Sequence, residues 1–153
     1  MKSYNPEIWT ALFRGVSFFD ILSDDDIVEL LEAGGIVRYD FHEYIIKEGD
    51  EDNAFFVVLK GRVKLLKEGE DKKKKDLWYL EKGECFGEIG LLLKTSRSAS
   101  ILAGKECYIF EMSNKAIGTL PEATKSKLYK KISISLAEKL KSTTEYIVNP
   151  TLF

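Results

Sequence analysis

Four residues close together in the chain carry groups that suit an anionic ligand with hydroxyl groups: Gly87, Glu88, Arg97 and Ser98. The planar guanidinium of Arg97 can hold two phosphate oxygens and stays charged at any working pH. Gly87 lacks a Cβ, so its backbone can approach a ligand, and the free amide groups of the turn after it favour phosphate. Glu88 can only accept hydrogen bonds, which suits a ribose 2′-OH. The stretch therefore predicts a site for a phosphate that carries a ribose.

Each of these residues also has an ordinary interpretation when it is taken alone. Gly87 could be a turn glycine, Glu88 an acid in the first turn of a helix, and Arg97 a surface cation. Glu88 and Arg97 could also form a simple salt bridge. The hypothesis of a binding site depends on their order and spacing.

That order resembles the phosphate-binding cassette of the cyclic-nucleotide-binding domain family, which includes catabolite activator proteins and regulatory subunits of protein kinase A. The family pattern is Phe-Gly-Glu-Leu-Ala-Leu, a short spacer and Pro-Arg-Ala-Ala-Thr-Val. Residues 86–91 read Phe-Gly-Glu-Ile-Gly-Leu and residues 96–101 read Ser-Arg-Ser-Ala-Ser-Ile, with no gap. Gly90 replaces alanine and Ser96 replaces proline, which should loosen the turn and the loop without removing a ligand contact. The turn glycines Gly49, Gly61 and Gly83 also fall where the family places them, so the resemblance covers nearly the whole chain.

The resemblance implies a cyclic mononucleotide, cAMP or cGMP, as the ligand, with no other cofactor. Glu88 would accept the ribose 2′-OH, Arg97 would bind the cyclic phosphate, and the backbone of Gly87 and Ser98 would complete the site. In the family, the segment after the barrel moves over the base as a lid, and Tyr146 and Ile147 are the candidates for that contact. The ligand-binding residues assigned in this way are Phe86, Gly87, Glu88, Ile89, Arg97, Ser98 and Ala99.

The central part of the chain, residues 36–112, alternates short β-rich runs with turn signals. This spacing predicts a mainly β fold with flanking helices, an α+β arrangement built on a β-sandwich or jelly-roll barrel. The charged run 68–76 reads as a solvated hairpin loop, because acids flank its four lysines. The predicted strands are Val37–Phe41, Tyr44–Lys47, Phe55–Leu59, Val63–Lys67, Leu77–Glu81, Ser98–Leu102 and Tyr108–Met112.

Helices are predicted before and after the barrel in the sequence, in a lead-in over 1–35 and in residues 113–149. Apolar residues recur at helical spacing from Pro6 to Phe19, and Ser23 followed by three aspartates reads as a helix N-cap rather than a cation site. Thr119 and Glu122 read as a capping box for a long final helix. The apolar stripe of that helix, which we interpret as core packing, comprises Leu128, Ile132, Leu136, Leu140 and Ile147.

Composition narrows the number of domains and the classes of function that the chain could have. With 153 residues and a net charge of −2, the chain predicts one domain over 1–153, without the basic excess typical of nucleic-acid or anionic-membrane binding. The single histidine, His42, cannot build a jelly-roll metal site or a catalytic triad, and Cys85 and Cys107 form no Cys-x-x-Cys pair. No leader or spanning segment is apparent. We therefore expect a soluble cytoplasmic protein that is not an enzyme and holds no metal.

The expected function is a cyclic-nucleotide receptor that signals through its C-terminal helix to an unidentified protein partner. The chain ends about where DNA-binding relatives would begin a helix-turn-helix module, so only the sensor is expected. The alternative is a domain of the same fold that serves protein interaction or oligomerisation without ligand. A homodimer through the 121–148 helix is a further option. The base stays open, because a hydroxyl after the arginine, as in Ser98, accompanies cGMP preference in some family members and cAMP binding in others.

Overall fold

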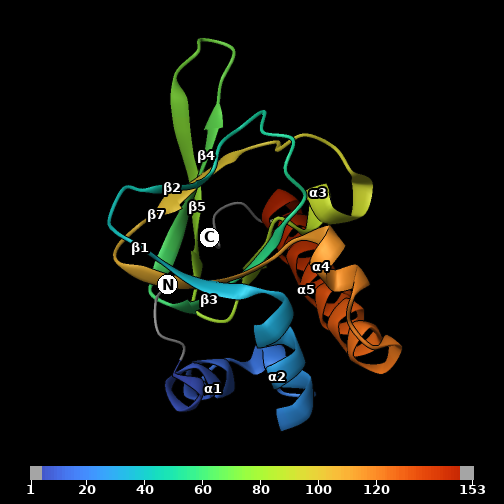
Figure 1. The fold of residues 1–153 in the computed structure, drawn as a ribbon. Helices are drawn as coiled ribbons and strands as arrows, with labels where there is room; N and C mark the ends of the chain where they lie inside the picture. Colours follow the sequence, from blue (N-terminus) through green and yellow to red (C-terminus); the bar gives the residue numbers. More distant parts are fainter. Residues whose placement is uncertain (1–4, 149–153) are drawn as a thin grey trace.

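Two four-stranded antiparallel sheets face each other and form the body of the molecule in the computed structural model (Figure 1). The structure describes residues 5–148, with the backbone alone at residues 76–77. The strand orders are β1-β8-β3-β6 and β2-β7-β4-β5. This arrangement confirms the predicted jelly-roll fold with flanking helices. The strands are β1 Gly35–Tyr39, β2 Tyr44–Ile46, β3 Phe55–Lys60, β4 Arg62–Glu68, β5 Lys74–Glu81, β6 Cys85–Phe86, β7 Ser100–Ala103 and β8 Cys107–Met112.

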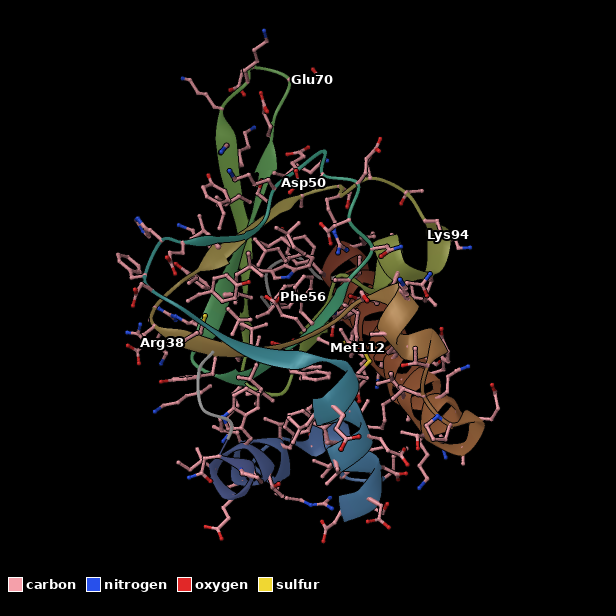
Figure 2. All side chains as sticks on the ribbon, in the orientation of Figure 1. Arg38, Asp50, Phe56, Glu70, Lys94 and Met112 are labelled. Carbon is pink, nitrogen blue, oxygen red and sulfur yellow. The ribbon has the colours of Figure 1, made fainter. Side chains whose placement is uncertain are left out.

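Strand β3 belongs to two apolar cores at once, because successive side chains of a strand point to opposite faces. Phe56 and Val58 pack between the two sheets with residues such as Phe86. Phe55 and Val57 face the other way and pack against the helices. A strand covered on both faces reads as a continuous apolar run, which is what residues 55–59 show. Figure 2 shows the labelled Phe56 within the body of the molecule.

The N-terminal elements are α1 Pro6–Arg14, the 3₁₀ turn η1 Ser17–Phe19 and α2 Asp24–Ala33. Their buried side chains, Phe13, Phe19 and Ile27 among them, pack under the first sheet. The Ser23 hydroxyl accepts from the Asp26 N–H while the Asp26 carboxylate accepts from the Ser23 N–H. This capping box confirms the prediction that Ser23 and the aspartates begin a helix.

The remaining helices are α3 Glu88–Leu93, α4 Asn114–Gly118 and α5 Glu122–Val148, which group on one side of the barrel (Figure 1). Two expectations about this region were wrong. The Thr119 hydroxyl donates to the Ala116 carbonyl and closes α4, so Thr119 is not the N-cap of α5. Only the first half of the apolar stripe of α5 packs in the core. Leu128 and Ile132 are buried, whereas Leu140 is 68% exposed.

The strand boundaries also differ from the predicted ones. Residues 74–76 belong to β5, so only residues 69–73 turn at the tip of the hairpin, which projects from the body with Glu70 at its end (Figure 2). Strand β1 begins at Gly35 and ends at Tyr39, and β7 begins at Ser100 rather than Ser98. The two-residue strand β6 was not predicted, because so short a strand has no period to detect.

Candidate ligand-binding site

The candidate site begins at Gly87, where strand β6 passes into α3. Gly87 is the N-cap of α3 and has a φ of 82°, the left-handed region that other residues rarely adopt. A Cβ at this position would lie 2.8 Å from the Ala54 carbonyl oxygen and 3.1 Å from Nη1 of Arg97. Gly87 is therefore required both for the turn and for the close approach of Arg97.

Arg97 lies 5% exposed against this turn. Its Nη1 donates to the Gly87 carbonyl at 2.9 Å, and its Nη2 donates to the Ala54 carbonyl. Its Nε and Nη2 both bind the Asp52 carboxylate. Arg97 thus returns to the glycine turn, as the sequence predicted. Asp52 and Ala54, in the loop before β3, also hold it there.

Asp52 changes what Arg97 can offer a ligand. Burial raises the pKa of Asp52, but the hydrogen bonds and charge of Arg97 outweigh this and lower the pKa below its usual value. Asp52 is therefore ionised and occupies the edge of the guanidinium that would otherwise take two phosphate oxygens. A phosphate would meet the remaining Nη1 side of Arg97 unless Asp52 moves away.

Glu88 lies in the first turn of α3 and is 4% exposed. Its Oε1 lies 2.6 Å from Nζ of Lys139, a residue of α5, and accepts a hydrogen bond from it. The two charged groups form an ion pair. The same ammonium donates to the Cys85 carbonyl at 2.5 Å. One turn earlier in α5, Ser135 Oγ lies 3.1 Å from the Cys85 thiol. Two successive turns of α5 therefore contact Cys85, one through its thiol and one through its carbonyl, just before the site.

A cavity of about 300 Å³ brings the predicted site residues together. This volume is at the lower end of the range of small-molecule sites, roughly 300 to 1,000 Å³. Apolar side chains from both sheets and the charged side chains of Lys67 and Lys139 complete its wall. All seven residues assigned from the sequence line it: Phe86, Gly87, Glu88, Ile89, Arg97, Ser98 and Ala99.

A second cavity of about 890 Å³ lies between α5 and strand β5, and it shares Trp78, Leu80 and Lys139 with the first. Tyr146, one of the two lid candidates, lines this second cavity. Ile147, the other candidate, is 73% exposed and lines neither cavity. The structure therefore places Lys139, rather than Tyr146 or Ile147, at the first cavity. Lid contacts by Tyr146 and Ile147 remain a prediction.

Sequence reasoning missed the residues that support the site from a distance. Asp52 and Lys139 lie 45 and 51 positions from their partners. Lys67 of β4 binds the Ser98 carbonyl and, at 3.0 Å, the Glu48 carboxylate. Asp52 lies in an acidic loop, where such residues normally face solvent, and no local signal distinguishes it. Lys139 lies on the same face of α5 as the buried Leu128 and Ile132, and this helical spacing could have indicated that it faces the barrel.

Among residues 5–148, no group of three or more His, Cys, Asp or Glu side chains is placed to hold a metal ion. Burial raises the pKa of each free thiol, Cys85 and Cys107, to about 11, so neither is a thiolate at neutral pH. Within the described residues, no helix combines the length and apolar character needed to cross a membrane.

Comparison with known proteins identifies the family. Residues 36–123 match the model of the cyclic nucleotide-binding domain. The match covers more than half of the chain and includes the whole of the site except Lys139. The chain belongs to the cyclic nucleotide-binding domain family, which confirms the resemblance found in the sequence.

Individual relatives share this region. Human cGMP-dependent protein kinase 2 is 34% identical over 126 residues, which are 78% of this chain and 16% of the kinase. The cAMP-activated global transcriptional regulator Vfr of Pseudomonas aeruginosa is 32% identical over 114 residues, 72% of this chain and 53% of Vfr. A cyclic nucleotide-binding domain from Methylobacillus flagellatus KT superposes with a TM-score of 0.80 at 18% identity, over 94% of this chain and 82% of that one. The last comparison supports the fold alone.

Proposed function

We propose that this chain is a non-catalytic receptor domain for a cyclic mononucleotide, cAMP or cGMP, and that α5 passes the presence of ligand to a partner protein in the cytoplasm. The observation that carries this proposal is that a buried arginine and a buried glutamate, each held by a different partner, line the same cavity. Arg97 and Glu88 are 5% and 4% exposed, and both line the 300 Å³ space. Charged groups are seldom buried without a partner or a function.

The phosphate would bind at Arg97, where the guanidinium is fixed by Asp52 and by the Gly87 and Ala54 carbonyls. A guanidinium that is already held in place loses little side-chain entropy when a phosphate arrives. Ser98 and Ala99 line the same part of the cavity. Their backbone would lie on the other side of the phosphate.

The sugar would bind at Glu88. Lys139 approaches Oε1, and Oε2 remains to accept the 2′-OH of a ribose. A base attached to this sugar would lie toward Trp78 and Leu65, which line the same cavity. Relatives named for cGMP and for cAMP are both similar to this chain, so the base is left to experiment.

Calorimetric titration of the nucleotide-free protein with cAMP and cGMP tests this function. We expect saturable binding of at least one of them, weakened more than tenfold by Arg97→Ala, because hydrogen bonds to charged groups are worth about 1.5 to 3 kcal/mol each. Arg38→Ala is the matched control: Arg38 also pairs with two acids, Asp40 and Glu106, but lies on β1, away from α3 (Figure 2). It should bind as the unchanged protein does.

Saturable binding that Arg97→Ala leaves unchanged would contradict the proposed site. No binding of either nucleotide would favour the alternative function, a domain of this fold that serves protein interaction or oligomerisation. A homodimer through α5 fits either function, because Leu140 and Ile147 leave an apolar surface at its end.

A further inference from the structure

Lys139 lies where the first and second cavities meet, since it lines both. Its side chain is 31% exposed, so part of it faces open space. An ammonium has three N–H donors. Two of them are used, by Oε1 of Glu88 and by the Cys85 carbonyl. Within the part of the chain that the structure describes, one donor of Lys139 is left for whatever binds beside Glu88.

The charges around the cavity also give Lys139 a role that Arg97 cannot fill. Arg97 is already matched by Asp52, so it does not neutralise Glu88. A cyclic phosphate would add another negative charge to a site that contains a buried carboxylate. Charge repulsion of this kind is strong where water is excluded. The ion pair with Lys139 would reduce this repulsion by neutralising the carboxylate of Glu88.

We infer that Lys139 is a specificity-determining residue that binds the ribose 2′-OH together with Glu88; this inference rests on the proposed function. The hydroxyl donates to the Glu88 carboxylate and accepts from the third N–H of Lys139, which closes a triangle on the 2.6 Å ion pair. A 2′-deoxy ligand satisfies neither group. The pair therefore selects ribose over deoxyribose, and it places one of the two selecting residues on α5.

The test compares the affinity for cAMP with that for 2′-deoxy-cAMP, and likewise for the cGMP pair, by calorimetry. The unchanged protein should prefer the ribose ligand by at least about tenfold. Lys139→Met should reduce that preference by about tenfold, because the hydroxyl loses a charged donor. Lys139→Arg, which keeps a charged donor, should retain most of the preference.

Lys141→Met is the matched control, because Lys141 is exposed on the same helix and should leave the preference unchanged. Thermal unfolding checks that each variant is folded. A purely structural role for Lys139 would weaken both ligands by the same factor and leave the preference intact, which would overturn the inference. Tighter binding of the ribose ligand by Lys139→Met would also overturn it, since the ammonium would then compete with the hydroxyl.

These outcomes can be separated from a failure of the proposed function. Binding of cAMP or cGMP by the unchanged protein, with a preference that Lys139→Met does not alter, would reject only the role of Lys139. If the unchanged protein bound no cyclic nucleotide, the proposed function itself would fail, and the inference with it.

Discussion

Arg97 is held by the barrel and the loop beside it, whereas Glu88 is paired with a residue of α5, 51 positions further along the chain. We call Arg97, Asp52 and Gly87 the phosphate half of the site, and Glu88 with Lys139 the sugar half. The side-chain contacts that hold Arg97 in the phosphate half all lie within residues 52–97. The sugar half is complete only when α5 lies against the barrel. Under the proposed function, the phosphate half would supply a fixed anchor and the sugar half would report occupancy to α5.

The two ends of α5 differ in a related way. Its first turns are bound to the N-terminal segment, where Lys127 pairs with Asp26 of α2 at 2.6 Å and Lys131 pairs with Asp20, between η1 and α2, at 2.9 Å. Beyond Lys139, residues 140–148 are exposed. A ligand shifts a conformational equilibrium only by binding one state better than another. Under the proposed function, the middle of α5, where Lys139 meets the site, is therefore the part that a ligand would bias.

At the sugar half, the largest expected effect tests whether Glu88 contacts the sugar. Glu88→Ala and the 2′-deoxy ligand should each lower affinity by about tenfold, while the two changes together should cost less than the sum of the separate free energies. The reason is that both remove the same hydrogen bond. Calorimetry of the four combinations measures the coupling, and full additivity would show that Glu88 and the 2′-OH do not touch. Glu106→Ala, a surface change on the other side of the barrel, is the control.

A smaller effect is expected at the exposed end of α5. Truncation after Ser142 removes the lid candidates Tyr146 and Ile147 but leaves Lys139 and the buried part of the helix. We expect a folded domain whose nucleotide affinity is lower by a few fold, because Tyr146 lines the cavity next to the site. A titration alongside the full chain measures this. Equal affinities would assign the contact with the base to other residues, such as Trp78.

The smallest expected effect on binding is at the anchored end of α5. Burial alone would raise the pKa of Asp26, but hydrogen bonds from Lys127, Ser23 and Thr124 lower it from 3.8 to about 2. Because the pKa of Asp26 is lower in the folded state, its ionised carboxylate stabilises the fold above about pH 4. This contribution is lost as the pH falls toward 2. Asp26→Asn should cost about 1 kcal/mol of the free energy of unfolding at pH 7, since solvent screens Lys127 in part.

Urea unfolding at pH 7 and at acid pH measures this cost, which should shrink as the acid unfolding region is reached. Asp25→Asn, at an exposed position in the same helix, is the matched control. Nucleotide affinity at pH 7 should change by less than about twofold in either variant. A large loss of affinity in Asp26→Asn would show that the two ends of α5 are not independent.

The sequence predicted the part of the fold that depends on local pattern. The run 55–59, the glycine turn at Gly87 and the return of Arg97 to that turn all follow from residue type and spacing. The charged hairpin was less predictable, because residues 74–76 gain strand structure from pairing with β4 rather than from their own propensity. The same holds for the end of α5, where an apolar spacing that is typical of a core lies in solvent at Leu140.

Long-range partners could not be predicted. The acidic loop that contains Asp52 has the composition of a solvated turn, and only the folded chain shows that Asp52 binds Arg97. Lys139 shares a helical face with the buried Leu128 and Ile132, unlike the exposed Lys141, but its partner Glu88 is apparent only when α5 is placed against α3. Both residues act through contacts between segments that are far apart in sequence, and a single sequence gives no measure of such contacts.

Amide hydrogen exchange with and without nucleotide tests the central claim, that α5 reports the occupancy of the sugar half. The account predicts that a bound cyclic nucleotide slows exchange at residues 86–101 and also between Leu128 and Ile147. In Lys139→Met, the first effect should remain and the second should be much reduced. Slower exchange at residues 86–101 with no change anywhere in α5 of the unchanged protein would contradict the claim and would show that this helix is only a scaffold.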